Sequence, residues 1–319
     1  MNFLITGASG FVGSQLVKAL FNRDSADHIA VLARKKDLSL NSEILQIIGK
    51  DGDNFFNEAI PSNIDVVIHL AGRAHILNDQ NKDPLAEFRK VNVDGTLQLA
   101  RQALKKKVKR FIFVSSIGVN GAITYGEPFS ESLEPKPHAD YAISKLEAEY
   151  VLKELFKHSD TELVIIRPPL IYAAHAPGNF SRLLKLVSTN LPLPFACTRN
   201  KRSFVALENL IDFIQVCINH PNAANQTFLV ADDESLSIRE IVEYLKDGMA
   251  KKPYFIHIPQ PLIKLGAVCV GKSKLYDQLF ESLEVDTAKA KKLLNWQAPL
   301  TAKKALIQTG KDYLESKSK

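Results

Sequence analysis

The residues best suited to chemistry are Tyr141 and Lys145, which stand four positions apart in the sequence. On a helix this spacing places the phenol and the ammonium group on one face. A phenol with its ordinary pKa of about 10 is a poor base at neutral pH, and a neighbouring ammonium group favours the ionised phenolate. The pair therefore predicts proton transfer to or from a substrate oxygen.

Ser116 is the expected third member of this group, because it follows a predicted strand and its hydroxyl could bind the same oxygen. The Tyr–Lys spacing alone is a weak signal, since it recurs at Tyr313 and Lys317, which we interpret as a coincidence on a solvated tail. The position of the first pair, at the start of a helix in a chain with a glycine loop, makes a catalytic role the better interpretation.

The glycine loop runs from Thr6 to Gly13, between a predicted strand and a predicted helix. Gly7 would allow a tight turn, Gly10 would let backbone N–H groups reach a pyrophosphate, and Gly13 would let helix and strand approach closely. An anion at this helix N-terminus is favoured by the free N–H groups and the helix dipole. The loop predicts a dinucleotide-binding site; a merely tight turn is the alternative.

The end of the second predicted strand bears on the choice of cofactor. The chain there reads Arg34-Lys35-Lys36, with no carboxylate before Asp37. An acidic residue would bind the ribose 2′-hydroxyl of NAD, whereas an arginine accommodates the 2′-phosphate of NADP. The sequence therefore favours NADP(H), with NAD(H) as the alternative if these basic residues are only solvated.

The predicted elements alternate between short apolar strands and helices, which is typical of a parallel sheet with helices on both faces. We therefore expect an α/β, doubly wound sheet of the Rossmann type. Expected strands cover 2–6, 28–34, 44–48, 65–70, 111–115, 163–167 and 227–230, and expected helices cover 11–21, 84–107, 141–156 and 207–219.

Beyond Arg167 proline becomes frequent and the alternation of strands and helices breaks down. We predict a nucleotide-binding domain over 1–167, with 204–231 rejoining it. The remaining segments, 168–203 and 232–319, would form a smaller, discontinuous α/β lobe for the substrate.

Composition narrows the class of protein. The chain has 319 residues and a net charge of +6, and its basic cluster at 105–109 ends a predicted helix rather than accompanying a nucleic-acid-binding motif. No apolar stretch reaches the ~20 residues of a membrane helix, and no signal peptide is read. Three scattered cysteines favour structural thiols in the cytoplasm over a disulfide or a metal site. We therefore expect that the protein neither binds nucleic acid or a metal ion nor inserts into a membrane.

Taken together, these motifs resemble those of the extended short-chain dehydrogenases/reductases, in their nucleotide-sugar epimerase/dehydratase branch. Within that branch it is similar to UDP-glucose 4-epimerase homologues and to the 4-keto-reductases that form UDP-N-acetylquinovosamine for O-antigen and lipopolysaccharide. The segments that carry the resemblance are Thr6–Gly13, His69–Gly72, Val91–Thr96, Ser115-Ser116, Tyr141/Lys145, Arg167–Pro169, Arg202–Leu210, Leu293–Trp296 and Pro299.

The resemblance implies a role for each matching residue. Tyr141 would be the acid/base, Lys145 its tuner and a ligand of the nicotinamide ribose, and Ser116 a clamp on the substrate hydroxyl. Cofactor contacts would come from Gly7, Gly10, Phe11, Val12, Gly13, Arg34, Leu70, Ala71, Asn92, Ser115, Tyr141, Lys145 and Pro168. The substrate would contact Ser116, Asn120, Asn179, Phe180 and Arg202.

Three positions depart from the family pattern. Asn120 replaces a usual tyrosine, which alters the expected sugar pocket. Ile117-Gly118 replaces the Asp-Glu pair of 4,6-dehydratases, so elimination chemistry is not expected. The usual late diphosphate arginine has no counterpart, since the only arginine after Arg202 is Arg239, at the start of an expected helix; that contact is either missing or replaced, for instance by a lysine.

The sequence thus predicts NADPH-dependent reduction of the C4 ketone of a UDP-4-keto-6-deoxy-N-acetylhexosamine. The main alternative is a UDP-glucose or UDP-GlcNAc 4-epimerase with tightly bound NAD. A non-catalytic dinucleotide sensor and a reductase of a carbonyl without a nucleotide are the weaker alternatives. The resemblance also implies a homodimer, formed through helices at 84–107 and 140–157.

Overall fold

The computed structural model describes residues 1–23, 27–37, 39–49, 56, 60–74, 81 and 83–318. A seven-stranded sheet runs in the order β3-β2-β1-β4-β5-β6-β9, and every neighbouring pair is parallel. The direction of winding reverses between β1 and β4, as in dinucleotide-binding sheets. The predicted doubly wound α/β fold is confirmed. Its strands are β1 (Asn2–Thr6), β2 (His28–Ala33), β3 (Leu45–Ile48), β4 (Val66–His69), β5 (Arg110–Val114), β6 (Glu162–Arg167) and β9 (Gln226–Leu229).

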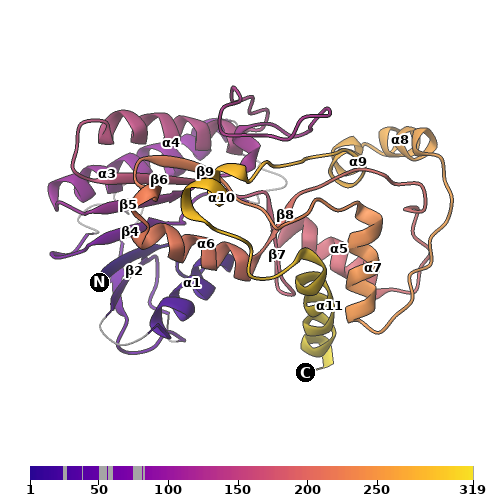
Figure 1. The fold of residues 1–319 in the computed structure, drawn as a ribbon, viewed down its shortest axis with the longest axis horizontal. Coiled ribbons are helices and arrows are strands. Elements are labelled where there is room, and N and C mark those ends of the chain that lie inside the picture. Colours follow the sequence, from indigo (N-terminus) through magenta and orange to yellow (C-terminus); the bar gives the residue numbers. More distant parts are fainter. Residues whose placement is uncertain are drawn as a thin grey trace.

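Helices cover both faces of this sheet (Figure 1). Phe3 and Ile5 of β1 join one apolar core with α1 (Phe11–Phe21) and α6 (Leu207–Asn219), while Leu4 joins another with α3 (Gly95–Lys105) and α4 (Asp140–Phe156). Successive residues of β1 are thus buried on opposite faces. This explains why the strands are continuously apolar in sequence.

The single helix predicted over 84–107 is interrupted. The structure has α2 (Pro84–Arg89), a π-helical turn (Lys90–Asp94) and then α3. Pro84 begins α2, as its sequence position predicts, and the Asp83 side chain accepts a hydrogen bond from the Ala86 N–H at 3.0 Å. The π turn brings the buried Asn92 into contact with Ser144 of α4 (Asp140–Phe156).

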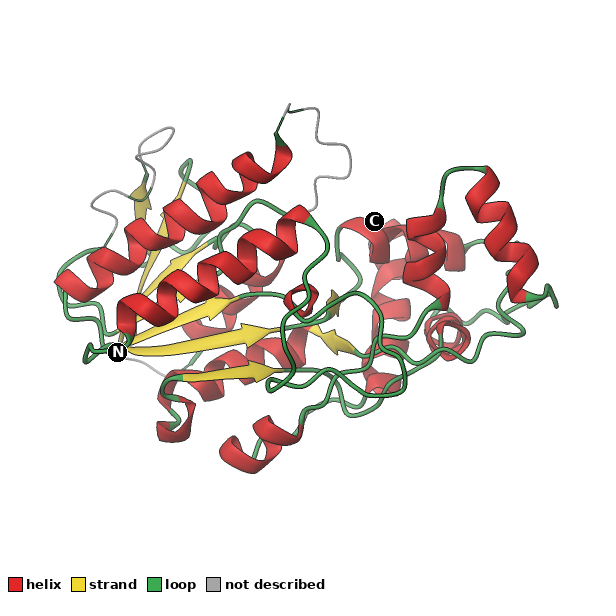
Figure 2. Ribbon diagram, turned by 90° about the horizontal axis from the view of Figure 1, so that it is seen from above, coloured by secondary structure: helices red, strands yellow, loops and turns green. Residues whose placement is uncertain are grey.

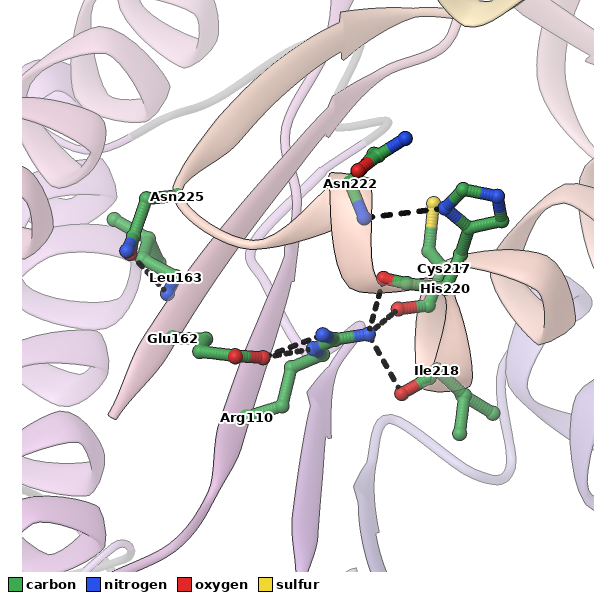
Figure 3. Close-up of polar contacts among 8 residues, drawn as sticks. All are labelled: Arg110, Glu162, Leu163, Cys217, Ile218, His220, Asn222 and Asn225. Atoms are coloured by element: carbon green, nitrogen blue, oxygen red, sulfur yellow. Dashed lines mark hydrogen bonds and ion pairs between the residues drawn. The ribbon is translucent and has the colours of Figure 1, made fainter. Parts of the chain in front are cut away.

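Arg110, at the start of β5, links the sheet to the helix that precedes its last strand. Its guanidinium group pairs with Glu162 of β6. It also donates to three backbone oxygens at the end of α6, those of Cys217 (2.7 Å), Ile218 (2.8 Å) and His220 (3.1 Å) (Figure 3). The carbonyl groups at the end of a helix lack N–H partners from the next turn, so the arginine satisfies acceptors at the end of α6 and holds the helix in place.

The rest of the chain forms a second, mainly helical lobe beside the sheet (Figure 1). Part of the segment predicted for the substrate lobe, however, packs on the sheet: Ala290, Leu294 and Trp296 belong to the core that contains α1 and α6. The remaining elements are the short helical turns η3 (Ile117–Val119) and η4 (Pro221–Ala223), the strand pair β7 (Leu170–Tyr172) and β8 (Phe204–Ala206), and the helices α5 (Gly178–Ser188), α7 (Ile238–Gly248), α8 (Gln260–Cys269), α9 (Ser273–Phe280), α10 (Ala288–Leu294) and α11 (Ala302–Ser318).

The second lobe depends on a close crossing of α7 and α11. A methyl group at Gly248 would overlap the carbonyl oxygen of Ile307, and one at Gly310 would overlap that of Leu245. Both glycines therefore permit backbone contact between the helices. The sheet strands point toward this lobe, as their arrowheads show in Figure 2. In the part of the chain that the structure describes, no helix combines the length and apolarity required to cross a membrane.

Candidate active site

The glycine loop joins β1 to α1 at the carboxyl edge of the sheet. Gly7 has a φ of +72°, and a Cβ atom there would lie 2.7 Å from the backbone nitrogen of Ala71. A Cβ atom at Gly13 would overlap the carbonyl oxygen of Gly7. The two glycines therefore allow β1, α1 and the end of β4 to meet through their backbones.

The N-terminus of α1 is suited to an anion. Gly10 is its cap residue, and among the described residues no side chain caps it and no acidic residue lies in its first turn. The N–H groups of the first turn, which include those of Phe11 and Val12, are thus left to a ligand. These residues fit the pyrophosphate of a dinucleotide.

A buried histidine supports the adjoining end of β4. His69 lies with Nδ1 2.6 Å from the Thr6 hydroxyl oxygen and Nε2 2.8 Å from that of Thr96. The Thr6 hydroxyl also accepts from the Ala71 N–H at 3.2 Å. Burial, together with a smaller effect of the Lys145 charge, lowers the pKa of His69 to about 3. The neutral ring thus fixes the backbone at Leu70 and Ala71, a role that sequence reasoning missed.

Lys145 reaches the same edge of the sheet from α4. Its Nζ donates to the carbonyl oxygen of Val114 at 3.0 Å and lies 4.5 Å from the centre of the Phe113 ring. A Cβ atom at Gly72 would lie only 3.3 Å from this Nζ. Burial lowers the pKa of Lys145 to about 8, although the charge of Glu149 opposes the shift. The ammonium group is therefore held between the ends of β4 and β5.

Tyr141 lies in the first turn of α4, one turn before Lys145. Its ring packs edge-on against Phe88, with 6.2 Å between the ring centres. Burial raises the pKa of Tyr141 to about 12. In the protein alone the phenol is thus protonated at neutral pH, the form that can donate a proton.

Ser116 faces the start of α4 through a short turn. It begins η3, and its Oγ accepts from the Gly118 N–H at 3.2 Å. A Cβ atom at Gly118 would lie 3.3 Å from the Cβ of Ala142 and 3.4 Å from the Ser116 Oγ. The turn that follows Ser116 therefore packs on the first turn of α4, which carries Tyr141.

Asn92 holds the first turn of α4 from the opposite side. Its amide nitrogen donates to the Ser144 hydroxyl at 3.0 Å and to the Arg73 carbonyl at 3.1 Å, and its oxygen accepts from the Arg73 N–H at 2.8 Å. The Ser144 hydroxyl in turn donates to the Tyr141 carbonyl oxygen at 2.8 Å. Among the described residues, Asn92 thus serves to position Tyr141.

A buried charge network lies behind the site. The Glu149 carboxylate, fully buried, accepts from the Ser115 hydroxyl at 2.6 Å and pairs with Arg167 at 2.5 Å. Arg167 also donates to the Asn120 side-chain oxygen at 2.9 Å, and the Asn120 nitrogen donates to the Ser130 carbonyl at 3.0 Å. Both ends of the Asn120 amide are therefore engaged with protein. Glu149 was not predicted, although its position four residues after Lys145 places it on the same helix face.

The predicted substrate residues of the second lobe lie in different settings. Arg202 Nη1 donates to the carbonyl oxygens of Glu281 (2.8 Å) and Asp277 (3.5 Å) in and after α9, and burial lowers its pKa to about 10. The Asn179 amide donates to the Gln278 side chain at 2.7 Å. Phe180 is part of the apolar core of the lobe.

Two further residues predicted to contact the cofactor, Arg34 and Pro168, follow strands of the sheet. Arg34 is exposed directly after β2 and is followed by the exposed Lys35 and Lys36. Pro168 is buried after β6, and its carbonyl oxygen accepts from the Ile117 N–H at 2.9 Å. The Pro168 carbonyl thus helps to fix the turn that follows Ser116.

Residues 3–231 match the sequence profile of the NAD dependent epimerase/dehydratase family, so the chain belongs to this family. The predicted resemblance, and with it an NAD(P)-dependent enzyme of the short-chain dehydrogenase/reductase type, is confirmed.

Individual relatives agree with this assignment. The chain is 40% identical to the UDP-glucose 4-epimerase of Vibrio cholerae over 320 residues, covering 100% of this chain and 97% of that protein. It is 29% identical to the N-acetyl-alpha-D-glucosaminyl-diphospho-ditrans,octacis-undecaprenol 4-epimerase of Escherichia coli O157:H7, covering 84% and 78%. The fold is similar to that of the UDP-glucuronic acid 4-epimerase from Bacillus cereus in complex with NAD, with a TM-score of 0.78 at 24% identity and complete coverage of both chains.

Proposed function

We propose that the protein reduces the C4 ketone of a UDP-4-keto-6-deoxy-N-acetylhexosamine with NADPH. The observation that carries this proposal is the placement of three residues: Tyr141 lies one turn before the buried Lys145 on α4, and Ser116 precedes the turn η3 that packs on the start of this helix. Burial also raises the pKa of Tyr141, which favours the protonated phenol. A ketone that gains a hydride needs one proton on its oxygen, and this phenol can supply it. The sugar and its 6-deoxy character are taken from the family resemblance.

The cofactor, when bound, supplies the hydride. In our proposal the first turn of α1 binds its pyrophosphate, and the exposed Arg34, with its two neighbouring lysines, binds a 2′-phosphate. No carboxylate follows β2 directly, so no acidic side chain there would repel the 2′-phosphate, and this favours NADPH over NADH.

The chain's own residues would then complete the reduction. Ser116 donates a hydrogen bond to the C4 oxygen, and Tyr141 transfers its proton to that oxygen as the alcohol forms. The Lys145 ammonium stabilises the resulting phenolate until solvent returns the proton. A positioned proton donor commonly increases the rate of such a reaction by a factor of about 10²–10⁴. Correct positioning of the two reactants increases the rate further.

Arg202 is proposed to bind the diphosphate of the substrate. A guanidinium group has five N–H donors, and the two described contacts to α9 engage only Nη1. Its planar fork suits phosphate oxygens. We do not propose elimination of water from the sugar, because Ile117 and Gly118 stand where 4,6-dehydratases have their Asp-Glu pair. A side chain at position 118 would also be crowded, since its Cβ atom would lie 3.3 Å from that of Ala142.

A second candidate function is a UDP-sugar 4-epimerase. It is favoured by the name of the Vibrio cholerae relative, which is similar along nearly its whole length. An epimerase would keep NAD bound and return the hydride to the opposite face of the same sugar. Tyr141 would then have to act as base and acid in turn.

Mass spectrometry of the nucleotides released from the purified protein separates the two candidates, when combined with assays of turnover. The reductase predicts little bound NAD and consumption of NADPH when the UDP-4-keto-6-deoxy sugar is added. Tightly bound NAD, with conversion of UDP-glucose or UDP-GlcNAc and no added cofactor, would select the epimerase instead.

A further inference from the structure

The helix α8 exposes an apolar surface that the described chain leaves uncovered. No residue of α8 is buried. Four apolar side chains on it and directly after it, which we call the α8 face, are each more than half exposed: Leu262 (59%), Leu265 (61%), Val268 (56%) and Val270 (66%). Surfaces of this kind usually mark an interaction site.

The opposite side of the helix explains why it stays in place. Ile263 and Ala267, one turn apart, pack against the apolar core of the second lobe. Residues 262 and 265 lie on the other side of the helix, because the helical repeat turns them away from 263 and 267. Figure 1 shows α8 at the end of the lobe farthest from the sheet. The α8 face is therefore presented outward on an anchored helix.

The segment of the chain that carries this face is basic. Between Asp247 and Asp277 the sequence contains five lysines and no acidic residue. The Nζ of Lys264 lies 3.9 Å from the Glu281 carboxylate, with its side chain 59% exposed, and Lys272 is exposed beyond the end of α8. Apolar side chains bordered by lysines are the pattern of a helix that lies in the interface of an anionic membrane.

We propose that the α8 face docks on the surface of an anionic lipid bilayer, with its axis in the plane of the membrane. The apolar side chains would enter the boundary between headgroups and acyl chains, and the lysines would bind lipid phosphates. Pairing with a second copy of the same face is disfavoured, because it would bring lysines together without acidic partners from this segment. Surface docking requires no spanning helix.

Co-sedimentation of the full chain with vesicles tests the proposal. Binding is expected to vesicles of phosphatidylglycerol and phosphatidylcholine in equal parts, and to be much weaker with phosphatidylcholine alone or in high salt. The double variant Leu265→Gln/Val268→Gln should bind at least about tenfold more weakly. The matched control is Leu45→Gln/Ile48→Gln, which removes equally exposed apolar groups from β3 and should bind as the original chain does.

Two exposed cysteines provide a second measurement without any substitution. Cys269 lies at the end of α8, whereas Cys197 lies outside it. Anionic vesicles should slow alkylation of Cys269 several-fold and leave Cys197 unchanged. Equal rates with and without vesicles, or undiminished sedimentation of the α8 double variant, would overturn the proposal. So would protection of Cys269 that follows protein concentration rather than lipid, which would indicate a second copy as the occupant.

Discussion

Burial sets the direction of the pKa shift of both Tyr141 and Lys145 in the protein alone. The sequence predicts a phenol made more acidic by the amine, yet burial raises the pKa of Tyr141 to about 12 and lowers that of Lys145 to about 8. Removal from water disfavours the charged form of each group, and it is the largest cause of both pKa shifts. A phenol that keeps its proton suits reduction of a ketone.

Lys145 should make cofactor binding depend on pH. Its ammonium group is charged below its pKa of about 8 and neutral above it, so affinity for an anionic dinucleotide should fall as the pH rises through 8. We expect the dissociation constant of NADPH, measured by fluorescence titration, to increase several-fold across this range.

Lys145→Met should bind NADPH more weakly and lose this pH dependence, whereas Lys35→Met, at an exposed position, should keep it. An unchanged pH profile in Lys145→Met would show that another group is responsible.

At the scale of elements, the glycine loop can be tested by steric substitution. Gly13→Ala places a methyl group against the Gly7 carbonyl oxygen, so α1 must move away from β1. We expect a loss of about 3 kcal/mol or more in the free energy of unfolding, together with loss of dinucleotide binding. Denaturant unfolding measures the first effect.

Gly266→Ala is the control, because this helical position of α8 faces open space. It should stabilise the protein slightly, by up to about 1 kcal/mol, as alanine favours helices over glycine. Equal effects of the two substitutions would contradict the close packing of the loop.

The helix α4 offers a matched pair of carboxylates. Glu149 is buried against Arg167 and Ser115, whereas Glu147 pairs with Arg89 at the surface. Glu149→Gln leaves the Arg167 charge buried without its partner and should cost about 3–5 kcal/mol in the free energy of unfolding. Glu147→Gln should change it little, since exposed pairs contribute little. Thermal unfolding of both variants provides the comparison, and equal stabilities would refute the buried network.

The strands of the large sheet and the helices beside it could largely be predicted from local sequence, whereas α5, α8–α11 and the pair β7 and β8 were not predicted. Apolar runs such as 2–6 and 163–167 set the strands to within one or two residues, and Pro84 marks the start of its helix. The π turn at 90–94 could not be predicted, because it accompanies contacts of Asn92 with Arg73 and Ser144, which are distant in sequence.

The same limit applies to the candidate site. The glycine loop and the Tyr–Lys pair have recognisable spacings, so sequence alone finds them. The network of Asn120, Arg167 and Glu149 joins three separate elements. No local pattern indicates that Asn120 would be engaged by an arginine, or that Arg202 would bind carbonyl oxygens of α9.

At the scale of the whole molecule, the family resemblance predicts that two copies of the chain associate. The predicted homodimer would use α2, α3 and α4, which lie on one face of the sheet (Figure 1). Tyr150 of α4 is 55% exposed. Exposed aromatic side chains are enriched at protein interfaces, so this residue would lie in the dimer contact. We predict a dimer in sedimentation equilibrium that Tyr150→Asp converts to monomer with its circular dichroism spectrum unchanged. A monomeric original chain, or a variant that remains dimeric, would contradict this interface.

The most direct test of the whole account is the activity of Tyr141→Phe, measured beside its binding of NADPH. The substitution removes only the hydroxyl, so the ring should still pack against Phe88. We predict that NADPH affinity stays within about twofold, while reduction of the UDP-4-keto-6-deoxy sugar slows by about 10²–10⁴. Turnover close to that of the original chain would contradict the assignment of Tyr141 as the proton donor.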